Sequence, residues 1–349
     1  MNRIVNIISV FVVLNFFVLA AGPNFKRIDQ WKHDDMCGMH FYSFIDKDNN
    51  VIGVFYKGLN FIISRDKLVK FANWGEGPSE LMGLEAFFEY KGDLAIVERA
   101  DKMKIFTKKD GTYVWKETKW LKRGRYLHAV KNGIFFDNKF FLAGVEDAEY
   151  VPHKKYTDTY FLRVLDEKGN LLKQQIKKTV TGDFNWINIK HYITGYKKDR
   201  VFYLTEHEPK VTVISSKTLE IVKEIALEVP PFYKKMPKDF YITKANISTA
   251  EFNRSLENWS MGYSKITNCC TTDKHLVLQI RTCNNKMKKF ALLFYNAETF
   301  KLENTIFIDD FFLGYKDGKY YFFANGNPSI DDDTDDFIIN IYAFTPEKK

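Results

Sequence analysis

Three histidines lie in or beside predicted β-strands of this chain, namely His40, His128 and His191. Imidazole nitrogen is a common ligand of divalent metal ions, and three histidines with one open position make a catalytic zinc centre. If the three strands surround one channel, the three rings can converge on one ion. The alternative interpretation is that each ring serves packing or the surface in its own environment, which is the usual role of a histidine on a strand.

Two carboxylates, Glu76 and Glu80, lie in a turn that contains Gly75, Gly77 and Pro78. Glycine supplies positive φ and proline fixes φ, so these residues define a tight turn between two strand-like runs. One interpretation places both carboxylates at a channel mouth, where they bind a ligand. The other interpretation is local: the glycines and proline form the connection between two groups of strands, and Glu80 caps backbone N–H groups.

The densest charge run is Asp331–Asp336, with Thr334 among five aspartates. Carboxylates suit Ca²⁺, but the run lacks the Gly and Glu positions of an EF-hand loop, so we interpret it as a solvated hairpin tip. The chain has no Gly-x-Ser-x-Gly elbow, no phosphate-binding loop and no His-Glu-x-x-His. Every strong sequence argument for an enzyme is therefore missing, although a site assembled from separate strands stays open.

An apolar run that ends in a small residue and a turn recurs six times along the chain. The copies are Leu59–Ser64, Met103–Thr107, Tyr160–Asp166, Val211–Ser215, Ala291–Asn296 and Phe337–Ala343. Their ends are 43, 59, 49, 81 and 47 residues apart, and the long interval contains an insertion at 229–262. A period in the forties is typical of a four-stranded propeller blade. The pattern predicts an all-β fold, a six-bladed β-propeller of four-stranded antiparallel blades.

The end of the chain predicts how the ring closes. Only residues 344–349 follow the sixth copy, so the last blade lacks an outermost strand. An unpaired edge is a liability, and residues 24–29 alternate as a strand does. We therefore expect residues 24–29 to pair with Phe337–Ala343.

The insertion at 229–262, between blades four and five, has a helical pattern. Ser248 and Glu251 form a capping box. Phe252, Leu256 and Trp259 then follow at helical spacing on one face. This pattern predicts a short helix that packs on one face of the propeller.

The turn at residues 75–80 resembles the Gly-x-Gly-Pro-Gly-Glu signature of secreted bacterial six-bladed β-propellers, the TolB-like or NHL-like group. The matching residues are Gly75, Gly77, Pro78 and Glu80, whereas Ser79 replaces the usual glycine and Leu81 the aromatic. The resemblance implies a bacterial propeller, and some NHL-like relatives are lyases or lactonases with a metal ion in the central channel. The Glu, Asn and Asp ligands of the calcium-dependent lactonases cannot be assigned to residues of this chain.

The N-terminus has the pattern of a secretory signal peptide. Arg3 precedes residues 4–21, which carry no charge, and Ala20-Ala21-Gly22 offers small residues for cleavage. We expect a signal peptide at 1–22, a mature domain at 23–349, and a secreted or periplasmic location without a stable membrane span. An uncleaved anchor is the alternative, because 18 uncharged residues nearly span a bilayer.

The charge of the chain indicates which partners to expect, and the cysteine spacing indicates whether disulfides form. The formal net charge of the 349 residues is +8, but lysines are spread along the chain, so we expect a lysine-rich surface and no nucleic-acid partner. The four cysteines, Cys37, Cys269, Cys270 and Cys283, include no Cys-x-x-Cys pair. A hairpin with Cys270 opposite about His275 places Cys283 too far along the strand to be bridged, so we expect free, mostly buried thiols.

The function expected from these observations is a binding scaffold for a protein or small-molecule ligand, with no cofactor. The alternative is a metal-dependent lyase or lactonase with a divalent metal ion in the central channel, held by His40, His128 and His191.

Overall fold

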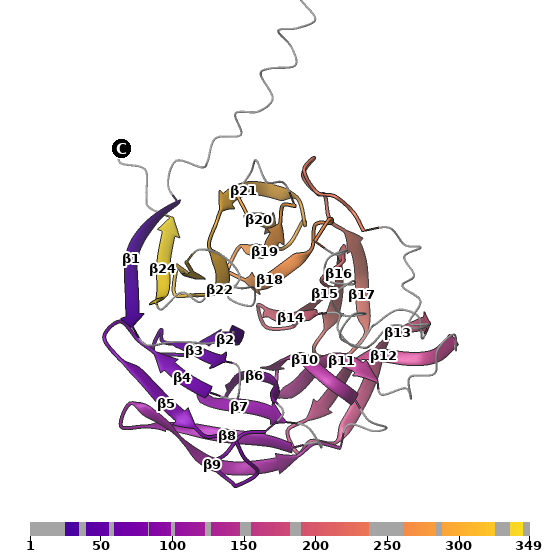
Figure 1. Cartoon of the computed structure of the whole chain (residues 1–349). Helices are drawn as coiled ribbons and strands as arrows, with labels where there is room; N and C mark the ends of the chain where they lie inside the picture. The colour runs from indigo at the N-terminus through magenta and orange to yellow at the C-terminus, as the bar shows by residue number, and fades with distance from the viewer. Residues whose placement is uncertain are drawn as a thin grey trace, which may run out of the picture.

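The computed structural model describes residues 25–34, 40–55, 59–82, 84–98, 102–122, 127–146, 155–181, 190–236, 261–283, 288–324 and 336–344. Six four-stranded antiparallel sheets are arranged around a common centre (Figure 1). The structure therefore confirms an all-β, six-bladed propeller.

Blades one to five are each built from four consecutive strands, with the first strand innermost. Blade one contains β2 (His40–Ile45), β3 (Val51–Phe55), β4 (Leu59–Ile63) and β5 (Leu68–Ala72). Blade two contains β6 (Leu84–Tyr90), β7 (Asp93–Glu98), β8 (Lys102–Lys109) and β9 (Thr112–Trp120). Blade three contains β10 (Leu127–Phe136), β11 (Lys139–Glu146), β12 (Lys155–Asp166) and β13 (Leu171–Thr181). Blade four contains β14 (His191–Tyr196), β15 (Arg200–Thr205), β16 (Glu208–Ser215) and β17 (Ile221–Ala226). Blade five contains β18 (Ile266–Thr271), β19 (His275–Arg281), β20 (Phe290–Asn296) and β21 (Leu302–Ile308).

Blade six combines both ends of the described chain. It contains β22 (Phe311–Lys316), β23 (Lys319–Phe323), β24 (Asp336–Phe344) and, outermost, β1 (Phe25–Asp34). β1 runs antiparallel to β24, with Phe25 opposite Phe344 and Trp31 opposite Ile339, and the two strands lie side by side in Figure 1. The predicted closure is confirmed for residues 25–29, and the pairing continues to Asp34.

The six recurring runs all fall on the third strand of a blade, from β4 to β24. This strand is covered on both faces by neighbouring blades, which explains continuously buried, mostly apolar stretches such as Val211 to Ile214 in β16. Tight hairpins connect the strands. Lys91-Gly92 and Asp317-Gly318, for example, have positive φ at both residues, as a two-residue type I′ turn requires.

Glycine lets the innermost strands approach one another near the centre. A Cβ atom added to Gly195 of β14 would lie 2.5 Å from the ring of Phe136 in β10. Gly133 of β10 is similarly close to Phe88 of β6, at 2.9 Å. Larger residues at these positions would push neighbouring blades apart.

Three cysteines have free thiols, as predicted: Cys269, Cys270 and Cys283. Cys37 lies outside the described residues. The predicted register of the hairpin was wrong by two residues, since Cys270 lies opposite Val277 rather than His275. The Thr272 hydroxyl accepts the His275 N–H at 2.9 Å and closes a shorter turn than expected. Six residues of strand still separate Cys283 from the position opposite Cys270, about 20 Å at 3.3 Å per residue, which is too far for a disulfide.

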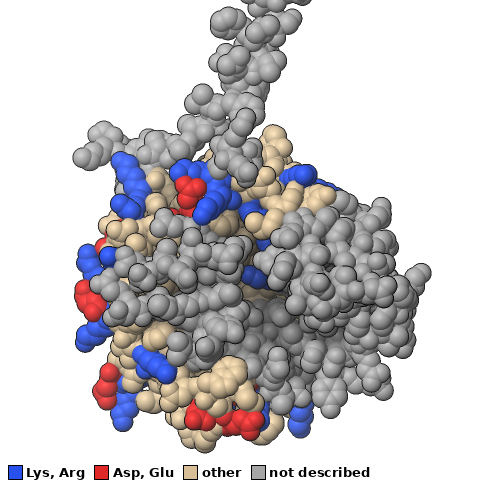
Figure 2. Space-filling view, viewed as in Figure 1, with Lys and Arg blue, Asp and Glu red and all other residues tan. Residues whose placement is uncertain are grey.

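Several predictions lie outside the described residues. They are the signal peptide at 1–22, most of the aspartate run at 331–336, and the helix expected at 248–259 within the insertion at 229–262. The described strands and loops include no helix, and hence none long and apolar enough to cross a membrane. In Figure 2, lysine and arginine side chains are interspersed with aspartate and glutamate around the described rim of the face in view.

Candidate functional site

The three histidines of the predicted metal site lie on innermost strands, His40 on β2, His128 on β10 and His191 on β14. The His191 ring is buried, with Nδ1 2.7 Å from the Tyr203 hydroxyl and its centroid 5.1 Å from that of Phe161. Because Phe161 belongs to blade three, the ring lies in the layer between blades three and four. The side chains of His40 and His128 are outside the described part. Among the residues that are described, no three His, Cys, Asp or Glu side chains are grouped to hold a metal ion.

The Glu80 side chain folds back onto the turn at residues 75–80. Glu80 Oε2 accepts the Gly77 N–H at 2.9 Å, and a Cβ atom added to Gly75 would lie 2.1 Å from the same oxygen. The N–H of Leu81 donates to the Asn73 carbonyl at 2.9 Å and closes the loop. Glu76 is exposed. Glu80 thus has a local capping contact, as the second interpretation of this turn expects.

A buried ion pair that the sequence did not reveal lies beneath this turn. Lys104 Nζ is 3.1 Å from Glu98 Oε2, and the two side chains are only 4% and 5% exposed. The same ammonium donates to the carbonyls of Gly77 at 2.9 Å and Glu80 at 2.5 Å. Glu98 Oε1 accepts the Met82 N–H at 2.6 Å. Blade two therefore anchors the turn by hydrogen bonds from a buried lysine.

A cavity of about 370 Å³ lies where the innermost strands of blades four, five and six end. We call it the channel-end pocket. It is lined by Gly195, Tyr196, Lys197, Thr271, Thr272, Asp273 and Tyr315. These residues are the last ones of β14, β18 and β22 and the turns that follow the first two strands. The volume is within the range of small-molecule sites.

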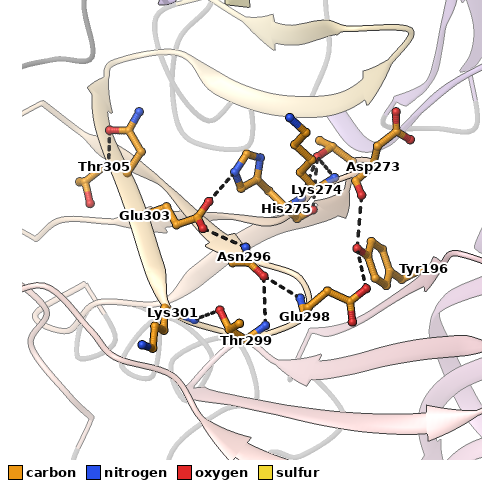
Figure 3. A network of polar contacts seen from close by, with 12 residues as sticks. Tyr196, Asp273, Lys274, His275, Asn296, Glu298, Thr299, Lys301, Glu303 and Thr305 are labelled. Carbon is orange, nitrogen blue, oxygen red and sulfur yellow. Dashed lines mark hydrogen bonds and ion pairs between the residues drawn. The ribbon is translucent and has the colours of Figure 1, made fainter.

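Hydrogen bonds between blades fix the walls of the channel-end pocket. The Tyr196 hydroxyl lies 3.2 Å from the Asp273 carbonyl and 3.3 Å from Glu298 Oε1, and the two acceptors share its one proton (Figure 3). The Thr271 hydroxyl donates to the Gly195 carbonyl at 2.6 Å. Blades four and five are thereby joined at the rim of the pocket, so its shape is set before any ligand arrives.

Glu298 forms ion pairs with two cationic side chains of blade four. Arg200 Nη1 lies 2.5 Å from Glu298 Oε2, and Lys197 forms an ion pair with Oε1. The hydrogen bonds from Arg200 and Lys197 lower the pKa of Glu298 to about 2. The contact with Glu298 likewise raises the pKa of Lys197. Both partners are charged at neutral pH and bind each other.

The loop that carries Glu298 is fixed by Asn296 and Glu303. Asn296 Oδ1 accepts the N–H groups of Glu298 and Thr299, each at 3.0 Å. Its amide nitrogen donates to Glu303 at 2.9 Å, and His275 Nε2 lies 2.9 Å from the other Glu303 oxygen (Figure 3). The hydrogen bond from Asn296 lowers the pKa of Glu303. These contacts hold the carboxylate of Glu298 in place.

The comparisons with known proteins show the fold. No protein-family model and no curated protein matches the chain. Its structure is similar to that of a predicted exported protein of Bacteroides fragilis, with a TM-score of 0.56, 15% sequence identity, and coverage of 93% of this chain and 97% of that chain. It is less similar to the WD40 domain of Neurospora crassa Pan2, with a TM-score of 0.47, 10% identity, and coverage of 93% and 96%. At these identities the likeness extends to the propeller fold alone.

Proposed function

We propose that this chain is an exported β-propeller of the TolB-like or NHL-like type that acts as a scaffold for binding a protein or small-molecule ligand. The observation that carries the proposal is the channel-end pocket, a preformed cavity of about 370 Å³ to which three successive blades contribute. Binding requires a hollow with a few fixed polar groups, and the walls of this pocket supply them.

Two further observations support the proposed propeller type and the proposed export of the chain. The turn at residues 75–80 carries Gly75, Gly77, Pro78 and Glu80 of the motif, and Glu80 caps Gly77 within it. The Bacteroides fragilis protein of similar fold is itself a predicted exported protein. Fusion of residues 1–22 to a reporter enzyme that is active only outside the cytoplasm tests export. An inactive fusion would contradict the proposed location.

Binding is tested by thermal denaturation of the mature chain with a panel of amines, amino acids, sugars, nucleotides and short peptides. A ligand that binds only the folded state raises the midpoint in proportion to RT ln(1 + [L]/Kd). The matched variant is Asp273→Trp, which places a bulky group at a lining position. We expect at least one ligand class to stabilise the wild type and not the variant. Equal shifts for both proteins would place binding elsewhere and contradict the assignment of this pocket.

The metal-dependent lyase or lactonase is the second function, and it requires His40, His128 and His191 on one ion, with nitrogen–metal distances near 2.1 Å. The His191 ring, which lies between blades, does not favour it. Elemental analysis of the purified mature protein tests the idea directly. One equivalent of bound zinc that disappears in His191→Ala would establish the metal site, and a metal-free protein would leave the enzyme hypothesis without support.

A further inference from the structure

Asp273 is the charged group of the channel-end pocket whose charge is not neutralised by its neighbours. No described residue donates a hydrogen bond to its carboxylate or forms an ion pair with it, and the residue is exposed. The contact from Tyr196 goes to the Asp273 backbone carbonyl, so the carboxylate points away from the network in Figure 3. Lys197, the other charged lining residue, is ion-paired with Glu298.

The uncharged polar groups of the pocket are already used within the protein. The Thr271 hydroxyl donates to the Gly195 carbonyl. The Thr272 hydroxyl accepts the N–H groups of Lys274 at 3.3 Å and His275 at 2.9 Å. What the pocket offers a ligand is therefore an anionic acceptor at Asp273 together with the aromatic ring of Tyr315.

A carboxylate beside an aromatic ring is suited to a cation. The face of a tyrosine ring carries negative electrostatic potential and attracts ammonium and guanidinium groups. A carboxylate forms charge-assisted hydrogen bonds with the same groups. An anionic ligand would instead meet Asp273 without a free lysine or arginine among the lining residues to balance it, because Glu298 already binds Lys197.

We propose that the channel-end pocket binds a cationic nitrogen group, an alkylammonium or alkylguanidinium, with Asp273 as the counter-charge and Tyr315 as the aromatic face. The cation is carried either by a free amine or by a lysine or arginine side chain of a protein partner. The proposal rests on the proposed binding function and names the chemical class of its ligand. The cavity of about 370 Å³ has room for such an alkyl chain and its head group.

The experiment uses the full mature chain with labelled threonine methyl groups, since Thr271 and Thr272 lie inside the pocket. The probes are four small molecules of similar size, namely butylguanidinium, butylammonium, neutral butyramide and anionic butyrate. We expect the two cations to shift the Thr271 and Thr272 methyl signals in NMR spectra, and the shifts to weaken with added salt as screening increases. The neutral and anionic probes should leave both signals in place.

Substitutions assign the contacts. Asp273→Asn keeps the shape and removes the charge, and should weaken binding of butylguanidinium about tenfold, as expected when a charge-assisted hydrogen bond becomes a neutral one. Asp66→Asn, at an exposed turn of blade one, is the matched control and should change nothing. Tyr315→Phe keeps the ring and should bind as the wild type does, whereas Tyr315→Leu should bind about threefold more weakly.

Each result bears on the proposal. Equal shifts with butyramide, or unchanged affinity in Asp273→Asn, would overturn the cationic ligand while leaving a binding pocket for another class. Absence of any shift with all four probes would overturn the cationic ligand, and the thermal panel with Asp273→Trp would then decide the binding function separately. Tighter binding of a capped, glycine-flanked arginine peptide than of butylguanidinium would assign the cation to a protein partner. The reverse order would assign it to a free amine.

Discussion

Removal of the buried ammonium beneath the turn at residues 75–80 should destabilise the protein strongly. In Lys104→Met, the carboxylate of Glu98 stays buried at 5% exposure without its ion-pair partner 3.1 Å away. The carbonyls of Gly77 and Glu80 also lose the ammonium that donates to them. Breaking a buried pair by removing one partner costs about 3–5 kcal/mol. Of this, the two deprived carbonyls account for about 1–2 kcal/mol.

A second substitution, Glu98→Gln, separates the cost of the lost ion pair from the cost of the lost hydrogen bonds to the two carbonyls. Glu98→Gln removes the buried charge, and the amide oxygen can still accept the Met82 N–H. The double variant Lys104→Met/Glu98→Gln should therefore be more stable than Lys104→Met alone, by about 2 kcal/mol, although it carries one more substitution. Lys116→Met is the matched control. Its ion pair with Asp93 spans 2.8 Å, but the lysine is 52% exposed, so solvent screening should make its loss of stability much smaller than that of Lys104→Met.

The measurement is reversible unfolding in guanidinium chloride, with the free energy of unfolding extrapolated to water. Lys104→Met should also lower the thermal midpoint, by about 5–10 °C for a domain of this size. A loss of stability in Lys104→Met no larger than that in Lys116→Met would refute the importance of the buried pair. A double variant less stable than Lys104→Met would refute it as well, since the loss of Lys104 from the buried carboxylate would then not be the main penalty.

Three further predictions concern other parts of the molecule. Trp31→Ala in β1, 7% exposed, should lower the free energy of unfolding by about 3–5 kcal/mol, whereas Ile28→Ala on the same strand, 48% exposed, should change it little in the same denaturation assay. Burial opposes ionisation of Glu206, but the hydrogen bond from His207 and the nearby lysines outweigh it and lower its pKa to about 2. The resulting stabilisation is present above pH 4.5 and is lost as the pH falls toward 2, so Glu206→Gln should be less stable than wild type at pH 7 and converge with it in acid. Alkylation of the unfolded, unreduced protein should label all four cysteines in the mass spectrum, and a shortfall of two labels would contradict free thiols.

The architecture could be predicted because it follows from local patterns. A third strand covered on both faces is mostly apolar, and six such runs at a blade-sized period define the ring. The closing strand could be predicted because the last blade was one strand short. The register of β18 and β19 could not, since a two-residue shift depends on whether the Thr272 hydroxyl closes the turn.

The contacts that define the candidate site could not be predicted, because their partners are far apart in the sequence. At the channel-end pocket, Tyr196 lies 77 residues from the Asp273 carbonyl that it binds. Beneath the turn at residues 75–80, Lys104 lies 27 residues from the Gly77 carbonyl that it binds. A charged residue in an otherwise buried strand, such as Lys104 in β8, is the one local signal of such a pair. It identifies a lysine that needs a partner but does not identify Glu98.

The channel-end pocket lies where the turns that follow the innermost strands of blades four and five meet the end of β22. In blade four, Tyr196 pairs with Arg200, so three residues form the turn, whereas Thr272 N–H donates to the His275 carbonyl in blade five and leaves a two-residue turn. These turns contribute Lys197 and Asp273 to the lining of the cavity. Tyr196 then joins the two turns by its hydrogen bond to the Asp273 carbonyl. With that bond the backbone of Asp273 is held while its carboxylate stays open to solvent, and this arrangement can bind a cation without first breaking a contact within the protein.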